Sequence, residues 1–198
     1  GYFVACGYHT HERDASDLVE GYPNAFAVHI DIRSRKSVIK AIAAVQKHWG
    51  ATVDIVINNA GIADEKQFEK ITDVDWDHML ETNLRGAFIV VQETHLGMQK
   101  KHWGRIVNMV SIGGQWGGQR QVHYAAAKAG GEEMSLAFAN TYKMTVIITH
   151  TMNVFGERQH PQKFIPMTIK KLLNNEKIII HSNKEKTKAG SRFWIHAR

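Results

Sequence analysis

Tyr124 and Lys128 lie four residues apart in a segment that predicts a helix from about Val122 to Ala137. Side chains at that spacing share one face of a helix. A lysine ammonium beside a tyrosine hydroxyl favours the phenolate, which makes the hydroxyl a stronger acid. Such a hydroxyl can give a proton to the alkoxide that develops from a carbonyl group. The pair therefore predicts a general acid, although pairs of this spacing also occur on solvated helix faces.

Two further polar residues stand where they could assist that chemistry. Ser111 directly follows a predicted strand, Arg105–Val110, where its hydroxyl would hydrogen-bond a substrate carbonyl. Asn83 lies in a long helical stretch that begins at Thr72 and Asp73 and runs to about Gln99. Its amide would hold a water molecule against the lysine.

The elements that must position these residues alternate between short β-rich runs and longer helical patterns. This alternation is typical of an α/β fold with a parallel sheet between helices. Ser34 is the expected N-cap of a helix that runs to about His48, and Gly50 is expected to end it. The predicted strands are nearly continuous apolar runs, as in sheets covered on both faces: Tyr2–Cys6, Ala25–Ile30, Val53–Ile57, Arg105–Val110 and Thr145–Thr149.

Several motifs occur together with the tyrosine and lysine. The third predicted strand leads into Asn58-Asn59-Ala60-Gly61, where small residues let a ligand approach the backbone. The others are Thr82-Asn83-Leu84-Arg85-Gly86, Gly104-Arg105-Ile106-Val107-Asn108, Ser111 and Tyr124-Ala125-Ala126-Ala127-Lys128-Ala129-Gly130. In this order and spacing, over about residues 1–135, the sequence resembles the short-chain dehydrogenase/reductase family. Within that family it is most similar to 3-oxoacyl carrier-protein reductases and acetoacetyl-CoA reductases.

The resemblance implies an NADP-dependent reduction of a carbonyl in a 3-oxoacyl thioester. Tyr124 would be the proton donor, Lys128 would bind the nicotinamide ribose, Ser111 would orient the carbonyl, and Asn83 would complete the proton relay. The residues implied to line the cofactor are Asp31, Ile32, Asn58, Ala60 and Gly61, together with Tyr124 and Lys128. In the alternative interpretation, Asp31 only begins a turn and Asn58 only caps the sheet.

The choice of NADP rests on the loop after the first predicted strand. An acidic residue there would bind the ribose hydroxyls of NAD, but this loop is mostly neutral or basic. His9, His11 or Arg13 would meet a 2′-phosphate, unless the loop is simply exposed and polar. NAD therefore stays possible.

A glycine-rich run, Gly113-Gly114-Gln115-Trp116-Gly117-Gly118, separates Ser111 from Tyr124. It is expected to border the substrate pocket. In that position Gly113, Gln115 and Trp116 would shape the substrate entrance, or would only form a turn.

The resemblance changes after about residue 135. The tail is similar to the extended branch of the same superfamily, the nucleotide-sugar dehydratases and epimerases, and by that resemblance Asn153, Lys163 and Arg192 would face a nucleotide diphosphate. Two parts are therefore expected: a truncated dinucleotide-binding domain over residues 1–150, and a partial substrate-binding segment over 151–198. The expected fold is an incomplete Rossmann-like, doubly wound parallel sheet with a short substrate-side segment appended at the C-terminus.

The family's glycine-rich pyrophosphate turn has no counterpart near the start of this sequence. Three hypotheses therefore remain open: a 3-oxoacyl thioester reductase, a nucleotide-sugar dehydratase or epimerase, and an inactive chimeric fragment that binds the cofactor at most weakly.

Composition limits the alternatives further. The chain has 198 residues, of which 43% are hydrophobic and 22% charged, as in ordinary globular proteins. One cysteine excludes an internal disulfide and fits a cytoplasmic protein. The net charge of +6 comes with no nucleic-acid motif and no membrane-spanning run, and the 12 histidines are scattered without metal-site spacing. We therefore expect a small-molecule substrate, no metal, no nucleic acid and no membrane partner, with a homo-oligomer possible.

Overall fold

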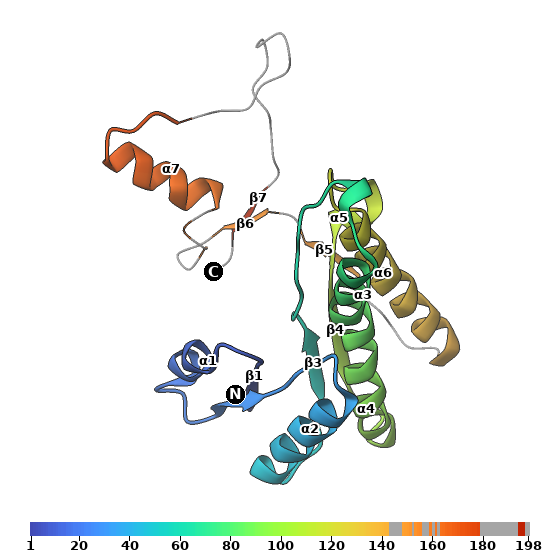
Figure 1. Cartoon of the computed structure of the whole chain (residues 1–198). Helices are drawn as coiled ribbons and strands as arrows, with labels where there is room; N and C mark the ends of the chain where they lie inside the picture. Colours follow the sequence, from blue (N-terminus) through green and yellow to red (C-terminus); the bar gives the residue numbers. More distant parts are fainter. Residues whose placement is uncertain are drawn as a thin grey trace. The chain divides into compact units, whose positions relative to one another are not determined.

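The computed structural model describes residues 1–142, 148–151, 153–155, 159, 161, 163–178 and 194–196. The chain forms two compact units, Gly1–His150 and Thr151–Arg198 (Figure 1). In the described residues no helix is long and apolar enough to cross a bilayer.

The first unit alternates strands and helices, as the sequence predicts. Two parallel pairings define its sheets: β1 with β2, from Val4 opposite Ala25 to Tyr8 opposite His29, and β3 with β4. Strand β5 adds to the other side of β4. The elements are β1 (Val4–Tyr8), α1 (Glu12–Val19), β2 (Ala25–His29), α2 (Arg35–Trp49), β3 (Ile55–Asn58), η1 (Phe68–Lys70), α3 (Asp73–Leu80), η2 (Glu81–Arg85), α4 (Gly86–Lys100), β4 (Arg105–Ser111), α5 (Ile112–Trp116), α6 (Val122–Tyr142) and β5 (Thr149–Thr151).

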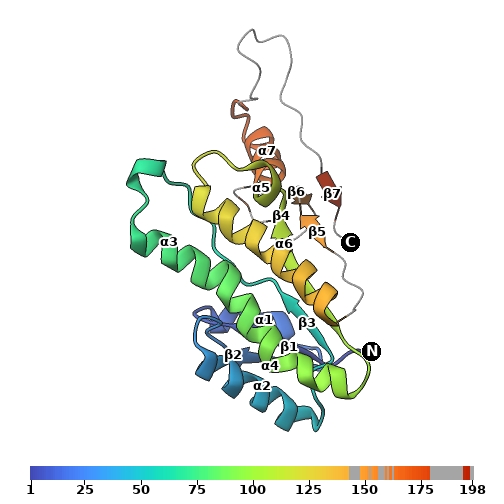
Figure 2. The same ribbon diagram turned by 90° about the vertical axis from the view of Figure 1, so that its right-hand side faces the viewer.

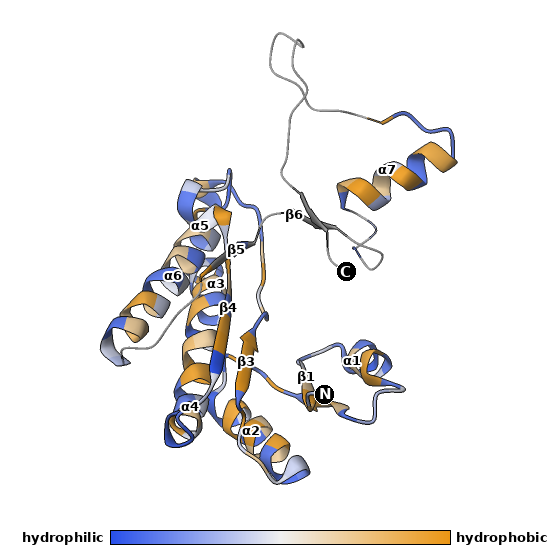
Figure 3. Cartoon of the chain, turned by 180° about the vertical axis from the view of Figure 1, so that it is seen from behind, coloured by the Kyte–Doolittle hydropathy of each residue, from blue (hydrophilic) through white to orange (hydrophobic). Residues whose placement is uncertain are grey.

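One face of the β3–β4 sheet is covered by α4 and α6 (Figure 2). Burial alternates along β3, where Val56 is buried while Ile55 and Ile57 on the opposite face are exposed. Strand β3 and most of β4 are coloured as hydrophobic, whereas the helices carry both hydrophobic and hydrophilic residues (Figure 3). The core of this unit therefore lies between the sheet and these helices, where Met79 and Ile89 are also buried.

The predicted ends of helix α2 are confirmed by its caps. The Ser34 hydroxyl accepts a hydrogen bond from the backbone N–H of Ser37. At the other end Gly50 has a φ of 63°, a left-handed conformation that glycine adopts without steric cost. The caps satisfy backbone groups that a helix leaves unpaired at its ends.

The long helical stretch after Thr72 is continuous but not uniform. Thr72 and Asp75 form a capping box at the start of α3, and the hydrogen bond from Lys66 is the main reason that the pKa of Asp75 is lowered. Five residues, Glu81–Arg85, then form a π turn (η2) before α4 continues. The sequence predicts one helix here, and it gives no sign of the π turn.

Other boundaries differ from the sequence predictions by a few residues. β1 begins at Val4 instead of Tyr2, and α6 continues to Tyr142 instead of ending near Ala137. Strand β5 begins at Thr149, where the predicted strand ends, and residues 143–147 lie outside the described part.

The second unit contains a parallel pair, β6 (Asn153–Phe155) with β7 (Trp194–His196), and helix α7 (Phe164–Leu173). The sequence predicts that this helix begins at Pro166, whereas α7 begins two residues earlier, at Phe164. Pro166 therefore lies in the first turn, where a proline is tolerated because the N–H that it lacks would have no partner within the helix. Of the strand predicted over Lys177–His181, the first two residues are not in a strand and the rest lie outside the described part.

Candidate active site

Asn83, Ser111, Tyr124 and Lys128, named here the Tyr124 corner, come from three elements of the first unit. Ser111 ends β4 and caps α5, and its hydroxyl accepts a hydrogen bond from the N–H of Gly113 at 3.1 Å. A Cβ atom on Gly113 would lie 3.4 Å from Ser111 Oγ and 3.6 Å from Tyr124 Cε1. The serine hydroxyl and the edge of the tyrosine ring therefore border the same glycine.

The Lys128 ammonium is buried beneath this corner. Its Nζ donates to the carbonyl of Met109 at 2.8 Å and lies 5.7 Å from the centroid of the Tyr124 ring. Burial lowers the pKa of Lys128, because the charged form is partly removed from water. An ammonium has three N–H donors, so two stay free for a water molecule or a ligand hydroxyl.

Asn83 is held in the π turn by hydrogen bonds to the loop after β3. Its side-chain N–H donates to the Ile62 carbonyl at 2.9 Å, and its Oδ1 accepts from the Ile62 N–H at 3.1 Å. The same side-chain nitrogen lies 3.2 Å from the Met79 carbonyl. Both ends of the amide are thus engaged, and the side chain is buried.

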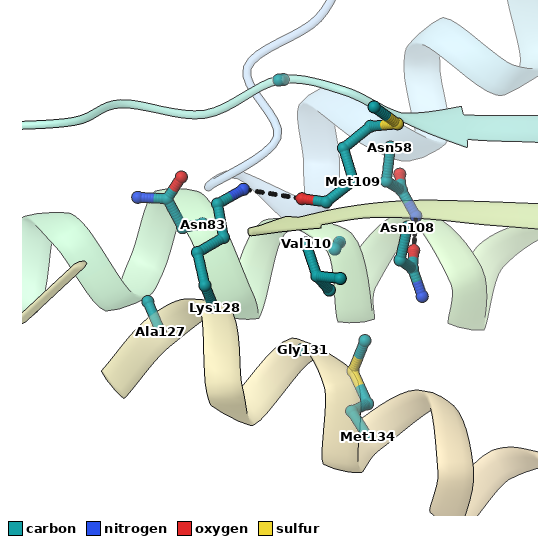
Figure 4. A pocket seen from close by; sticks show the side chains of 11 residues that line it. Asn58, Asn83, Asn108, Met109, Val110, Ala127, Lys128, Gly131 and Met134 are labelled. Carbon is teal, nitrogen blue, oxygen red and sulfur yellow. Dashed lines mark hydrogen bonds between the residues drawn. The ribbon is translucent and has the colours of Figure 1, made fainter. Parts of the chain in front are cut away.

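A small cavity of about 10 Å³ lies between these elements (Figure 4). That volume is close to the minimum that holds one water molecule, and polar groups are on hand to bind it. The sequence hypothesis of a water between Asn83 and Lys128 fits this space. The lining comprises Asn58, Ala60, Asn83, Ala87, Asn108, Met109, Val110, Ala127, Lys128, Gly131 and Met134.

A second polar chain, missed from the sequence, holds the start of the Asn58–Gly61 loop. Asn58 Nδ2 donates to Asn108 Oδ1 at 2.7 Å, and Asn108 Nδ2 donates to Ser135 Oγ at 3.0 Å. The Ser135 hydroxyl in turn donates to the Gly131 carbonyl. Strands β3 and β4 are therefore tied to α6 by side chains, and the Gly104–Asn108 motif was the available signal.

The loop after β3 has no space for a side chain at Gly61. A Cβ atom on Gly61 would lie 2.5 Å from Asn83 Oδ1 and 3.6 Å from Lys128 Nζ. Gly61 and Ala60 are exposed, so their backbone is open to a ligand on the side away from the core.

A second group of charged residues, named the Asp31 cluster, comprises His9, Asp31 and Arg33 at the carboxyl ends of β1 and β2. Arg33 binds both oxygens of the Asp31 carboxylate, through Nε at 3.0 Å and Nη2 at 3.1 Å. His9 Nε2 is 3.7 Å from the same carboxylate. Hydrogen bonding from Arg33 is the main reason that the pKa of Asp31 is lowered.

The structure separates the three side chains that the sequence offered as alternative partners of the 2′-phosphate. His9 lies at Asp31, whereas His11 hydrogen-bonds its neighbour Thr10, and Arg13 pairs with Asp17 on the surface of α1. Arg33 takes the place next to the carboxylate, and its spacing of two residues from Asp31 was the signal in the sequence. Ile32 packs against Gly86, where an added Cβ would come within 2.6 Å of its side chain.

The other predicted substrate residues fall into two groups. Gly113, Gln115 and Trp116 lie on α5, with Trp116 exposed. Asn153 lies on β6 and Lys163 is the exposed N-cap residue of α7, both in the second unit, while Arg192 lies outside the described residues.

Comparison with known proteins now decides the family. The family model described as short chain dehydrogenase matches residues 1–154. The chain belongs to the short-chain dehydrogenase family. Its parallel strand pairs and their helices are consistent with the Rossmann-like α/β fold expected from the sequence.

Individual members of the short-chain dehydrogenase family resemble the same region. The chain is 38% identical to an acetoacetyl-CoA reductase of Rhizobium meliloti over 141 residues, which are 70% of this chain and 57% of that protein. It is 36% identical to the corresponding enzyme of Shinella zoogloeoides over 130 residues, 66% of this chain and 53% of that protein. The chain thus spans about half the length of these relatives.

Two further similarities extend this result. A 3-oxoacyl-acyl-carrier-protein reductase of Aquifex aeolicus is 39% identical over 106 residues, 54% of this chain and 42% of that protein. A crystal structure from Agrobacterium tumefaciens, assigned as a gluconate dehydrogenase, is 26% identical and superposes with a TM-score of 0.70. That alignment covers 79% of this chain and 64% of the other.

Proposed function

We propose that this chain forms the carbonyl-reducing site of an NADP-dependent reductase of 3-oxoacyl thioesters, with Tyr124 as the proton donor. The observation that supports this most is the arrangement of the Tyr124 corner, where a buried lysine ammonium lies under the tyrosine ring and a serine hydroxyl lies beside it. The named relatives that reduce acetoacetyl-CoA and 3-oxoacyl groups support the substrate class.

The chain's own residues supply positioning and the proton. The Ser111 hydroxyl would donate a hydrogen bond to the substrate carbonyl oxygen and fix it near the Tyr124 hydroxyl. Tyr124 would then give its proton to that oxygen as negative charge develops there. The buried Lys128 ammonium favours this transfer, because its positive charge stabilises the phenolate that remains. A water in the cavity beside Asn83 would return a proton to the tyrosine through the lysine.

A bound nicotinamide dinucleotide would supply the hydride for the carbonyl carbon. The residues present fit such a group, since the exposed backbone of Ala60 and Gly61 and two free donors of Lys128 face the carboxyl ends of the strands. Asn58 would hold the loop through Asn108. Asp31 and Ile32 would lie at the adenine end.

NADP is favoured over NAD by the Asp31 cluster. Arg33 pairs with the Asp31 carboxylate, and His9 lies near it. The carboxylate is therefore already occupied by a positively charged partner and is less able to bind the ribose hydroxyls of NAD. Arginine presents a planar fork of donors that suits a phosphate as well as a carboxylate. A 2′-phosphate on the ribose would therefore gain the arginine and the histidine as partners.

The test is turnover of acetoacetyl-CoA with NADPH, followed by loss of NADPH absorbance. We expect Tyr124→Phe to lower the rate about 100-fold or more, because it removes the proton donor but keeps the ring. Tyr142→Phe on the same helix is the matched control and should keep the rate of the unmodified chain. Absence of turnover in the unmodified chain, or full activity of Tyr124→Phe, would refute the proposal.

Cofactor choice has its own test, which needs no turnover. Arg33→Ala should weaken binding of NADPH in a fluorescence titration and leave binding of NADH unchanged. Arg13→Ala, which removes an exposed arginine on α1, should change neither. Equal weakening for the two cofactors would contradict a phosphate contact at Arg33.

A further inference from the structure

The turn between α5 and α6, residues 117–121, carries a charged side chain that nothing described so far uses. This turn joins the helix that Ser111 caps to the helix that carries Tyr124. Within it, the N–H of Gln121 donates to the Gly118 carbonyl at 3.2 Å. The turn therefore has a defined conformation at one side of the Tyr124 corner.

A second backbone bond ties the turn to the loop after β3. The N–H of Lys66 donates to the carbonyl of Arg120 at 2.8 Å. Lys66 follows Gly61 on that loop, and its ammonium is bound to the Asp75 carboxylate on α3. The two loops that border the Tyr124 corner are thus joined at Arg120, while the Lys66 charge is already paired.

The backbone of Arg120 has a conformation that favours glycine. Its φ is 58°, in the left-handed region. Gly117, at the start of the same turn, has a φ of 68° and meets that requirement with the residue that fits it best. Larger side chains held in such conformations are concentrated at functional sites. The conformation of Arg120 is therefore a first indication that its side chain has a use there.

The Arg120 guanidinium is also the one that stays free. In the part of the chain that the structure describes, every other arginine has a partner: Arg13, Arg33 and Arg35 pair with carboxylates, and Arg85 and Arg105 donate to backbone carbonyls. Arg120 is exposed and makes no side-chain hydrogen bond, ion pair or ring contact with a described residue. Even Asp64 and Glu65, next to Lys66, form no ion pair with it. Its five N–H donors are therefore available to a ligand.

A guanidinium with free donors suits a phosphate group, whose oxygens match its planar fork. A 3-oxoacyl thioester would present its carbonyl to Tyr124, whereas its carrier would extend away from the corner. Coenzyme A and acyl carrier proteins both hold the acyl group on a pantetheine arm that ends in a phosphate ester. The two carriers therefore share one anionic group at the outer end of that arm.

We propose that Arg120 is a substrate-binding residue that holds the pantetheine phosphate of the thioester carrier at the entrance to the Tyr124 corner. The inference deepens the proposed function and rests on it for the identity of the carrier. Arg120 takes no part in proton transfer. It binds the outer end of the substrate, while Ser111 and Tyr124 act on the carbonyl.

The test is a calorimetric titration with 4′-phosphopantetheine and with pantetheine, two probes that differ by one phosphate. Arg120→Gly removes the guanidinium and keeps a residue suited to the positive φ, so the fold should be retained. We expect it to weaken binding of 4′-phosphopantetheine about tenfold and to leave binding of pantetheine unchanged. Coenzyme A, which contains the same phosphate, should lose affinity by the same factor.

His102→Gly is the matched control, because His102 is also exposed and has a φ of 52° in the turn after α4. It should leave binding of all three probes unchanged. Arg120→Gly should not affect binding of NADPH, since the cofactor phosphates lie outside this turn. In turnover of acetoacetyl-CoA, Arg120→Gly should raise KM and leave kcat unchanged, whereas Tyr124→Phe lowers kcat.

The titration involves no reduction, so its outcome is independent of the reductase assay. Failure of the unmodified chain to bind 4′-phosphopantetheine would overturn the inference, and so would equal binding by Arg120→Gly. A loss of affinity confined to coenzyme A, or one that extends to NADPH, would equally contradict a contact with the pantetheine phosphate.

Discussion

The Tyr124 corner and the Asp31 cluster are the two ends of one proposed cofactor site, and they are built differently. At the Tyr124 corner, buried amides, a buried ammonium and glycines with neighbours at close range fix each side chain from several directions. At the Asp31 cluster, half-exposed charges hold one another near the surface. The comparison indicates that the reacting end is fixed by packing, whereas the adenine end is held by electrostatics. The first should be intolerant of added volume, and the second sensitive to pH and salt.

The largest effect is expected where packing is tightest. Gly114→Ala would place a methyl group 2.8 Å from the backbone of Ala129, and helix backbones cannot move aside as side chains do. We expect a loss of roughly 1–3 kcal/mol in the free energy of unfolding, measured by urea denaturation. Gly97→Ala on α4 is the control, because its new Cβ meets Thr52 at 3.4 Å or more. It should be neutral, or stabilising by up to about 1 kcal/mol. Equal behaviour of the two variants would contradict the proposed difference in packing.

Removal of the buried amide should cost nearly as much. Asn83→Ala leaves the N–H and the carbonyl of Ile62 without their partners, and an unsatisfied buried group costs about 1–3 kcal/mol. Denaturation should show this loss, and reductase activity should fall with it. Asn24→Ala, in the turn before β2, serves as the comparison for an asparagine outside both sites. A wild-type denaturation midpoint for Asn83→Ala would show that the corner is not held as described.

Much of this arrangement follows from local sequence signals. Ser34 and Gly50 marked both ends of α2 correctly, because caps depend on the residues themselves. Asn83, Ser111, Tyr124 and Lys128 were predicted from motifs in which spacing along a helix or strand fixes direction, and their catalytic roles stay proposals. The role of Arg33 was not predicted, although the residue lies two positions after Asp31, and the π turn was not predicted because the helical pattern of the sequence does not reveal one extra residue in a turn. In the second unit, Arg192 and most of the strand predicted over Lys177–His181 lie outside the described residues, so these stay predictions.

The pH dependence of the free energy of unfolding on the alkaline side should report the burial of Lys128 in the Tyr124 corner. The pKa of Lys128 is lowered by burial, so above that lowered value the folded chain binds fewer protons than the unfolded chain. Stability contributed by this group should therefore rise with pH up to the ordinary lysine range, and then level off. Lys128→Met should remove this rise, as measured by denaturation at a series of pH values. A variant with an unchanged pH dependence would show that the ammonium is not desolvated.

The smallest effect is expected in the free energy of unfolding at acidic pH, where Asp31 titrates. The pKa of Asp31 is lowered mainly by its hydrogen bonds with Arg33, so its contribution is present above the ordinary aspartate range and is lost as pH falls through the lowered value. Asp31→Asn should remove that contribution, and an ion pair this exposed is worth at most about 1 kcal/mol. Added salt should weaken it further, whereas salt should leave Asn83→Ala unaffected. If the effect of Asp31→Asn on stability did not depend on salt, the Asp31 cluster would not be held by electrostatics as described.

The π turn η2 has a consequence for how the gene can change. Two of its residues face opposite ends of the proposed site: Asn83 bonds to Ile62, and Arg85 donates to the Arg33 carbonyl at 3.1 Å. A π turn accommodates one residue more than an α turn. Loss of a single codon within 81–85 would therefore convert the π turn into an α turn and leave the two flanking helices about in register. Such a deletion preserves the reading frame and the helix, but it would remove the wider turn from which Asn83 reaches Ile62 and Arg85 reaches Arg33.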